Sequence, residues 1–152
     1  MSEEQVKVLE DVVEVEYKWN PGPVVGRFLT DLRDNKEITA VRCTRTSKVF
    51  LPPQSVSPYG QNKMDRFVSI TSTPKFRVGT IVYKAPWNKP EGIDVPYMLA
   101  AVDFAGADTQ LLHIVKGSEE ELKALKAGDS LKPKWKDEPV GTVRDLDYFE
   151  IA

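Results

Sequence analysis

The chain has 152 residues, which is enough for one compact domain or for two small lobes that share a core. Hydrophobic residues make up 41% of it and charged residues 29%, and no stretch approaches the ~18 apolar residues of a membrane helix, so we expect no membrane partner. The formal net charge of −2 argues against a protein whose main partner is nucleic acid.

The first residues and the cysteine content indicate a cytoplasmic location. The start, MSEEQVKVLE, is acidic and lacks the cationic and apolar regions of a secretion signal. The single cysteine, Cys43, excludes an internal disulfide and is typical of a reducing compartment.

The N-terminal half is predicted to hold an extended arm, a helix and a hairpin. Apolar residues alternate over 13–19, which indicates a strand or an extended arm. After an Asn-Pro-Gly break, apolar residues at helical spacing predict a helix over 23–35, ending at a residue that tolerates the left-handed conformation. Two strands, 38–41 and 48–51, then form a hairpin that the diproline at 52–53 ends.

From Phe67 onward the pattern changes to short strands separated by turn residues. The expected strands are 67–72, 78–84, 97–104, 110–115, 131–135 and 146–151. Ser118 and Glu121 form a capping box that opens a short helix, 119–126, and Gly128 ends it. Four or five strands with one helix between the third and the fourth is the element order of an OB-fold barrel.

The stretch Val41–Gly60 has the frame of a small zinc ribbon without most of its ligands. Such a ribbon needs two loops, each with two soft ligands about three positions apart. Cys43 begins the first pair, but its mate is Thr46, and the second loop has Ser57 and Gly60. A hydroxyl is a poor zinc ligand and glycine offers none, so we predict that zinc is absent.

Several longer segments carry a resemblance to a known family. They are YKWNPGPVVGRFLTDLRDNKEITAVRC (17–43), KVFLPP (48–53), VGTIVYKAP (78–86), VPYMLAAVDFAG (95–106) and LKAGDSLKPKW (125–135). In this order and spacing they resemble the acyl-CoA-associated, rubredoxin-like zinc-ribbon/OB-fold proteins, known as domain of unknown function thirty-five.

The resemblance implies a fold class and a division of the chain. The fold is expected to be mainly β with an N-terminal helix, in which a degenerate zinc-ribbon hairpin precedes a five-stranded OB-fold barrel. The expected division is 1–37 for the arm and helix, 38–66 for the degenerate ribbon, and 67–152 for the OB-fold domain.

The resemblance also implies the function. Family members are accessory subunits of thiolases, hydroxymethylglutaryl-CoA-synthase-like enzymes, or thiolase-fold aldolases and acyltransferases. We therefore expect a non-catalytic subunit of a hetero-oligomeric acyl-CoA-converting complex, above all a thiolase. Acyl-CoA is then a ligand shared with the thiolase-fold partner, and no cofactor is bound by this chain itself.

The residues offer no convincing catalytic set. Nucleophilic catalysis needs an activated Ser or Cys beside a base. The one histidine, His113, lies in a predicted strand and is far in sequence from Cys43, so a structural role is favoured for both. Neither a P-loop nor a dinucleotide-binding glycine motif is present.

Two groups of residues are candidate binding sites. For CoA, cations near aromatic faces stand in the first long loop of the barrel: Tyr83, Lys84, Trp87 and Lys89. A solvated loop whose Trp87 packs on the barrel or on a partner is the competing interpretation. For the partner interface, the candidates are Trp19, Phe28, Arg42, Arg45 and Lys48.

Two other functions remain open. OB barrels often bind single-stranded nucleic acid through basic grooves and stacking aromatics, and this is the main alternative. An enzyme that acts by itself on an acyl-CoA is weaker, because the residues supply no nucleophile and base.

Overall fold

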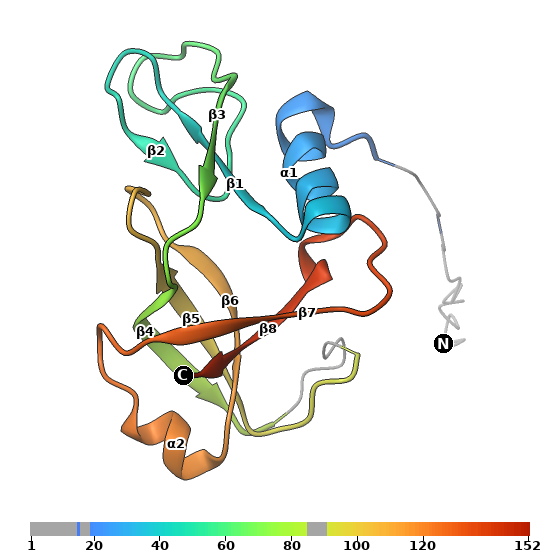
Figure 1. Ribbon diagram of the computed structural model, residues 1–152, viewed down its shortest axis with the longest axis vertical. Helices are drawn as coiled ribbons and strands as arrows, with labels where there is room; N and C mark the ends of the chain where they lie inside the picture. Colours follow the sequence, from blue (N-terminus) through green and yellow to red (C-terminus); the bar gives the residue numbers. More distant parts are fainter. Residues whose placement is uncertain (1–14, 16–18, 85–90) are drawn as a thin grey trace, which may run out of the picture.

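The computed structural model describes residues 15, 19–84 and 91–152. It consists of a small three-stranded sheet with a helix beside it and, below them, a five-stranded barrel (Figure 1). The predicted class, mainly β with an N-terminal helix, is confirmed. Most of the arm predicted over 13–19 lies outside the described residues. No helix in the described part is long and apolar enough to cross a membrane.

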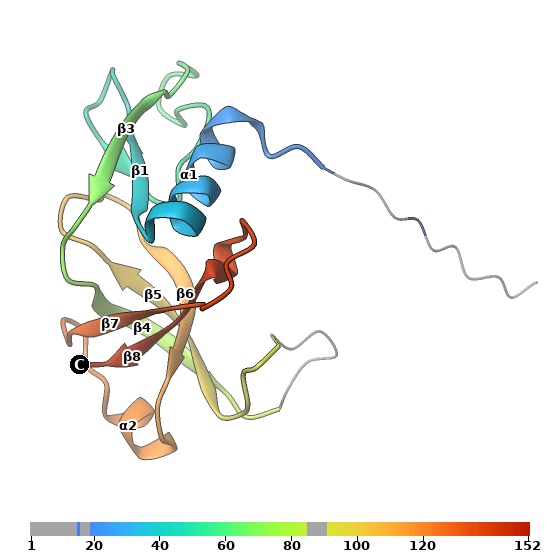
Figure 2. The same ribbon diagram turned by 45° about the vertical axis from the view of Figure 1, so that its right-hand side comes forward.

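Helix α1, Gly22–Asn35, forms where the apolar spacing predicts it. Proline is accepted in its first turn, and its buried stripe includes Val24, Phe28 and Leu32. The left-handed residue at its end is Lys36, with φ 51°, one position later than predicted. Both ribbon views show α1 beside β1, Ile38–Arg42 (Figures 1 and 2). The helix also contacts the short 3₁₀ helix η1, Val143–Asp145.

The first sheet has the order β2-β1-β3 and is antiparallel throughout. Its strands are β1, Ile38–Arg42; β2, Val49–Phe50; and β3, Arg66–Ile70. The sequence analysis placed the strand at 67–72 in the barrel half, and this is wrong, because β3 pairs with β1 along its whole length. The second sheet therefore begins only after the connection 71–74.

The second sheet is an OB-fold barrel with the order β4-β5-β6-β8-β7. Its elements are β4, Lys75–Val82; β5, Tyr97–Asp103; β6, Leu111–Lys116; α2, Glu119–Ala124; β7, Leu131–Trp135; η1, Val143–Asp145; and β8, Leu146–Ile151. Strands β6 and β8 are parallel, and a bridge between Lys75 and Ser130 joins the outer strands. The 3₁₀ helix η1 is the element that the sequence analysis missed.

The predicted capping box at the start of α2 is confirmed. Ser118 N–H donates to Glu121 Oε2 at 2.8 Å, and Glu121 N–H donates to Ser118 Oγ at 3.3 Å. The helix ends at Ala124, two positions before the predicted end.

One hydrophobic core joins the helix, the small sheet and the barrel. Leu32 of α1 and Leu51 after β2 belong to the same buried cluster as Phe149 of the barrel. Polar contacts fix the same junction: Asp108 Oδ2 accepts from Val49 N–H at 2.7 Å, and Thr109 Oγ1 accepts from Leu51 N–H at 2.7 Å. The β5–β6 turn thus holds β2 in place over the barrel.

Candidate functional site

The small sheet keeps both loops of a zinc ribbon in matching backbone conformations. In each loop the N–H of the first residue donates to the carbonyl of the residue five positions later. The N–H of the residue four positions later donates to the carbonyl of the first residue. These bonds are Cys43 N to Lys48 O (2.8 Å) and Ser47 N to Cys43 O (2.9 Å), then Ser57 N to Asn62 O (3.0 Å) and Gln61 N to Ser57 O (3.0 Å). The fifth residue of each loop has a positive φ, 61° at Ser47 and 54° at Gln61. We call these two loops the knuckles.

The residues at the four ligand positions do not fit a zinc ion. Cys43 Sγ donates a hydrogen bond to Ser57 Oγ at 3.1 Å, and Thr46 and Gly60 complete the set. Within the described residues, no group of three or more His, Cys, Asp or Glu side chains is placed to hold a metal. The centre of the ribbon is instead packed: Cys43, Met64 and Val41 are each 0% exposed. The absence of zinc from the purified protein stays a prediction.

Cys43 is the strongly perturbed titratable group of the ribbon. Once Cys43 loses the proton that it donates to Ser57, the hydroxyls of Ser57 and then of Thr46 donate to the thiolate. These hydrogen bonds lower the pKa of the Cys43 thiol to about 6, although burial opposes this shift. The thiolate is therefore favoured in the fold near neutral pH, inside a core that is closed to solvent.

This shift predicts a pH-dependent stability. The folded pKa, about 6, lies below the unfolded value of about 8.5, so the unfolded chain binds more protons between them. The contribution of Cys43 to the free energy of unfolding should be complete above pH ~8.5 and be lost as the pH falls through 6. Urea unfolding between pH 5.5 and 9 measures it. The Cys43→Ala variant should lack this component, and equal pH profiles for the two proteins would contradict the assignment.

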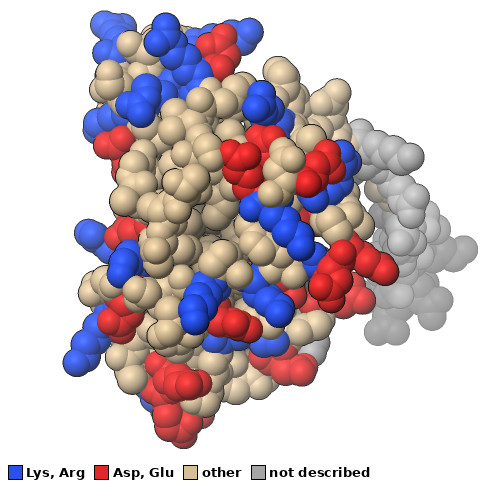
Figure 3. Space-filling model, in the orientation of Figure 1, with Lys and Arg blue, Asp and Glu red and all other residues tan. Residues whose placement is uncertain are grey.

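Basic side chains gather at the end of the ribbon that lies farthest from the barrel. Blue atoms cluster there at the top of Figure 3. The cations around the two knuckles are Arg42, which pairs with Arg66, Lys63, which forms a bridge with Val56, Arg45, which lies beside Gly60, and Lys48, whose Nζ donates to Tyr59 OH. We call this surface the ribbon tip. Lys48 Nζ lies 4.5 Å from the Tyr59 ring centroid, and Arg42 Nη1 donates to Ser47 O at 3.1 Å. No salt bridge within the described residues involves these cations.

The partner-interface candidates separate in the structure. Arg42, Arg45 and Lys48 share the ribbon tip, and Trp19 is 85% exposed ahead of α1. Phe28 is only 3% exposed and packs in the main core, so its side chain is not on the surface, and the expectation for this residue is corrected. The helical spacing identified an apolar stripe but could not tell the core from a partner. The interface role of the other residues stays a prediction.

The CoA-binding candidates lie far from the ribbon tip. Tyr83 OH donates to Glu119 Oε1 at 3.2 Å, which places the end of β4 beside α2, at the opposite end of the molecule (Figure 1). Tyr83 is 56% exposed and Lys84 is also exposed. Trp87 and Lys89 lie outside the described residues. The structure therefore does not join this loop and the ribbon tip into one site.

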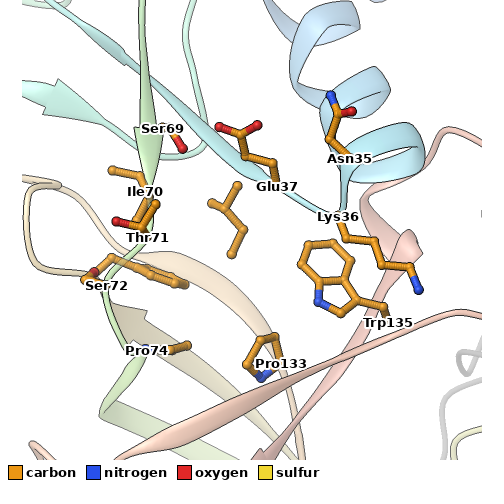
Figure 4. Close-up of a pocket in the computed structure, with 12 residues that line it drawn as sticks. Asn35, Lys36, Glu37, Ser69, Ile70, Thr71, Ser72, Pro74, Pro133 and Trp135 are labelled. Carbon is orange, nitrogen blue, oxygen red and sulfur yellow. The ribbon is translucent and has the colours of Figure 1, made fainter.

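A cavity of about 510 Å³ lies between the two sheets. Its walls come from the α1–β1 turn, the β3–β4 connection and β7 (Figure 4). The side chains that line it are Asn35, Lys36, Glu37, Ile38, Ser69, Ile70, Thr71, Ser72, Pro74, Phe104, Pro133 and Trp135. Ser72 Oγ is buried there without a hydrogen-bond partner. Sequence analysis missed this cavity because its lining comes from separate segments with no shared motif.

No catalytic pair forms around the histidine. His113 is 6% exposed, its ring lies edge-on to Phe149 at 5.6 Å, and its Nε2 is 3.5 Å from Val143 O. Burial lowers the pKa of His113, so the ring is neutral in the fold. Within the described residues no hydrogen bond joins it to a Ser, Thr or Cys side chain. The favoured structural role of His113 agrees with this geometry.

Comparison with known proteins identifies the fold. No protein-family model and no curated protein matches the sequence. A protein of unknown function from the DUF35 (domain of unknown function thirty-five) family of Sulfolobus solfataricus matches with a TM-score of 0.61 and 18% identity, over 86% of this chain and 87% of that chain. The Ltp2-ChsH2(DUF35) aldolase matches with a TM-score of 0.57 and 15% identity, over 83% and 93%. The chain therefore has the fold of the DUF35 proteins, as the resemblance in its sequence predicted.

Proposed function

We propose that the chain is a non-catalytic accessory subunit of an acyl-CoA-converting complex whose catalytic subunit is a thiolase-fold enzyme. The observation that carries the proposal is the likeness, over most of both chains, to the DUF35 protein of the Ltp2-ChsH2 aldolase. The isolated histidine and the closed Cys43 support the non-catalytic part, because a nucleophile must meet both its base and its substrate.

Two places on the chain are candidates for the CoA thioester. CoA combines an adenine and several phosphates with a long, flexible arm, and a site for it needs cations near an aromatic face. The cavity between the sheets offers Trp135 and Lys36 around a volume of about 510 Å³. The loop after β4 offers Tyr83 and Lys84, together with Trp87 and Lys89. We propose the cavity as the first candidate because a concave site surrounds more of a ligand than an exposed loop does, and Tyr83 is exposed.

The nucleic-acid alternative receives less support. The usual ligand face of an OB fold lies on its second and third strands, which are β5 and β6 here. The exposed large hydrophobic side chains of these two strands are Leu99 and Leu112, and neither is an aromatic on which a base could stack.

Affinity purification of the tagged chain from its own organism, followed by mass spectrometry to find a co-purifying thiolase-fold enzyme, tests the proposal. We expect a stoichiometric complex, thiolase activity in the complex, and none in this chain alone. Robust activity of the isolated chain would refute the non-catalytic role, and failure to form a complex would refute the accessory role.

The position of the CoA site has its own test within that complex. We expect Trp135→Ala to raise the KM for acyl-CoA by about tenfold, which corresponds to ~1.4 kcal/mol of lost binding. Lys84→Ala is the matched variant in the second candidate site and should have a smaller effect. The reverse order would place CoA on the loop after β4.

A further inference from the structure

The ribbon tip concentrates positive charge in a chain that is acidic overall. Residues 38–66 contain five cations and one acid, whereas the net charge of the whole chain is −2. Arg42 of β1 and Arg66 of β3 are paired residues, so two like charges lie directly opposite each other. Such a pair destabilises a sheet, and neither arginine forms a salt bridge within the described residues. An anion bound between them would remove this cost.

Exposed apolar side chains lie among the cations of the ribbon tip. Tyr59 is 54% exposed, and Lys48 Nζ lies 3.3 Å from its hydroxyl oxygen. Val56 is 52% exposed and forms a bridge with Lys63. Tyrosine and arginine are enriched at protein interfaces. The ribbon tip therefore suits a polypeptide that combines acidic and apolar side chains.

The segment before α1 has this complementary composition. Residues 1–14 lie outside the described residues, but their sequence contains five acids and one cation, a net charge opposite in sign and equal in size to that of residues 38–66. Val15 is 65% exposed and Trp19 is 85% exposed, although tryptophan is highly buried on average. The rest of the chain therefore leaves these two side chains largely uncovered. We call residues 1–15 the acidic arm; its acids are Glu3, Glu4, Glu10, Asp11 and Glu14.

The chain enters α1 on the side of the small sheet opposite to the tip arginines. Thr39 Oγ1 donates to Asp31 Oδ2 of α1 at 2.6 Å, so Thr39 and the alternate residues of β1 face the helix. Arg42 belongs to the other set and faces away from α1, as does its partner Arg66. Both ribbon views show the blue chain before α1 leaving on the side of the helix that faces away from the sheet (Figures 1 and 2). A contact within one chain would have to pass around the sheet, whereas a second copy can present its ribbon tip directly.

We propose that the chain forms a homodimer in which the acidic arm of each copy binds the ribbon tip of the other. Carboxylates of the arm lie between Arg42 and Arg66, and Trp19 packs on the exposed apolar side chains of the tip. Reciprocal contact of this kind is the commonest way in which a soluble chain forms a closed dimer. Exposed ion pairs are individually weak and screened by salt, so the dimer is reversible and salt-dependent. This inference goes beyond the proposed function and does not depend on it.

Sedimentation of the full chain at low and at high salt tests the proposal. We expect a dimer at low salt that dissociates in about 1 M salt, where the Debye length is about 3 Å. Arg42→Gln combined with Arg66→Gln, the tip variant, should raise the dimer Kd by about tenfold and leave the Tm unchanged, because both side chains are exposed. The matched control, Lys132→Gln with Lys134→Gln, removes two exposed cations from β7 and should change the Kd less than about twofold.

Mixing two variants shows whether the contact is exchanged between copies. The arm variant, Glu10→Gln with Asp11→Asn and Glu14→Gln, keeps an intact ribbon tip, and the tip variant keeps an intact arm. A mixture should therefore form a heterodimer through one intact contact, with a lower Kd than the dimer of either variant alone. Native mass spectrometry distinguishes the three dimers by mass.

Other outcomes would overturn the proposal. A wild-type chain that is monomeric at low salt would do so, as would a dimer that neither variant weakens. Variants that weaken the dimer but form no heterodimer would show that the arm and the tip do not meet between copies. Carbodiimide cross-links from the arm to Lys48 or Lys63 that arise only in the monomer would identify the same copy as the occupant, whereas such cross-links in the dimer would support the exchange.

Discussion

Replacing Thr46, Ser57 and Gly60 by cysteine is expected to create a protein that binds one zinc ion per chain. The wild-type ribbon holds the two knuckles in matching conformations, with the same pair of backbone hydrogen bonds and a positive φ in each. Cys43 already occupies one ligand position and lies 3.1 Å from the oxygen of Ser57 at another. Four thiolates in this frame are a tetrahedral structural site.

The least favourable of the three substitutions is at Gly60. A Cβ added there would lie 2.9 Å from Arg45 Nη1 and 3.0 Å from Arg45 Cδ. Both atoms belong to the outer part of a flexible side chain, which can move into solvent. Gly60 is not among the residues with positive φ, so its backbone accepts a side chain. The substitution is therefore compatible with the knuckle.

The stability gain should be large and dependent on metal. With zinc at about 1,000 times its Kd, binding to the folded state contributes about 4 kcal/mol. For a chain of this size that corresponds to a rise in Tm of roughly 8–16 °C, which a chelator should reverse. Elemental analysis should give one zinc per chain for the triple variant and none for the wild type or for Ser57→Cys alone. Zinc in the wild-type protein would refute the degenerate site, and a triple variant without zinc would refute the matching knuckles.

Much of the fold could be predicted from local signals. Helix α1 follows from apolar spacing with a proline in its first turn, and α2 from the Ser118–Glu121 capping box. Both signals act within a few residues, so they can be recognised without knowledge of the tertiary structure. The barrel strands were placed by short apolar runs between turn residues, and their ends shifted by only a few positions.

The features of the fold that could not be predicted depend on contacts between distant segments. The strand at β3 has the same pattern whichever sheet it joins, and its pairing with β1 decides the sheet. The buried position of Phe28 depends on the barrel residues beneath α1. A helical stripe shows that a face is apolar but does not show what covers it.

The candidate sites divide in the same way. The degenerate knuckles could be read directly, because the ligand positions and the residues at them are local. The exposure of Leu99 and Leu112 could not, since both lie in mainly apolar strands, β5 and β6, whose pattern suggests burial on both faces. Only the fold shows that these two side chains are exposed.

Removal of one buried carboxylate is expected to destabilise the barrel strongly. Asp145, in η1, is 1% exposed. Its two oxygens accept hydrogen bonds from Val140 N–H at 3.0 Å, Gly141 N–H at 2.7 Å and Thr142 N–H at 3.2 Å, and from Thr142 Oγ1 at 3.4 Å. The carboxylate thereby organises the turn that leads into η1.

The Asp145→Ala variant leaves those backbone donors without their acceptor. Hydrogen bonds to a charged group are worth about 1.5–3 kcal/mol each and are not additive, so we expect a net loss of about 3 kcal/mol. The Tm should fall by roughly 6–12 °C. Chemical unfolding measures the loss, and Asp34→Ala, which removes an exposed carboxylate paired with Arg33, should change the free energy of unfolding far less than Asp145→Ala.

The Asp145→Asn variant separates hydrogen bonding from packing. Asparagine has nearly the same shape but retains one acceptor oxygen and places an amide N–H₂ against the backbone donors. If the hydrogen bonds carry the effect, the free energy of unfolding of Asp145→Asn should lie between the values for the wild type and for Asp145→Ala. An asparagine variant as stable as the wild type would show that shape alone holds the turn.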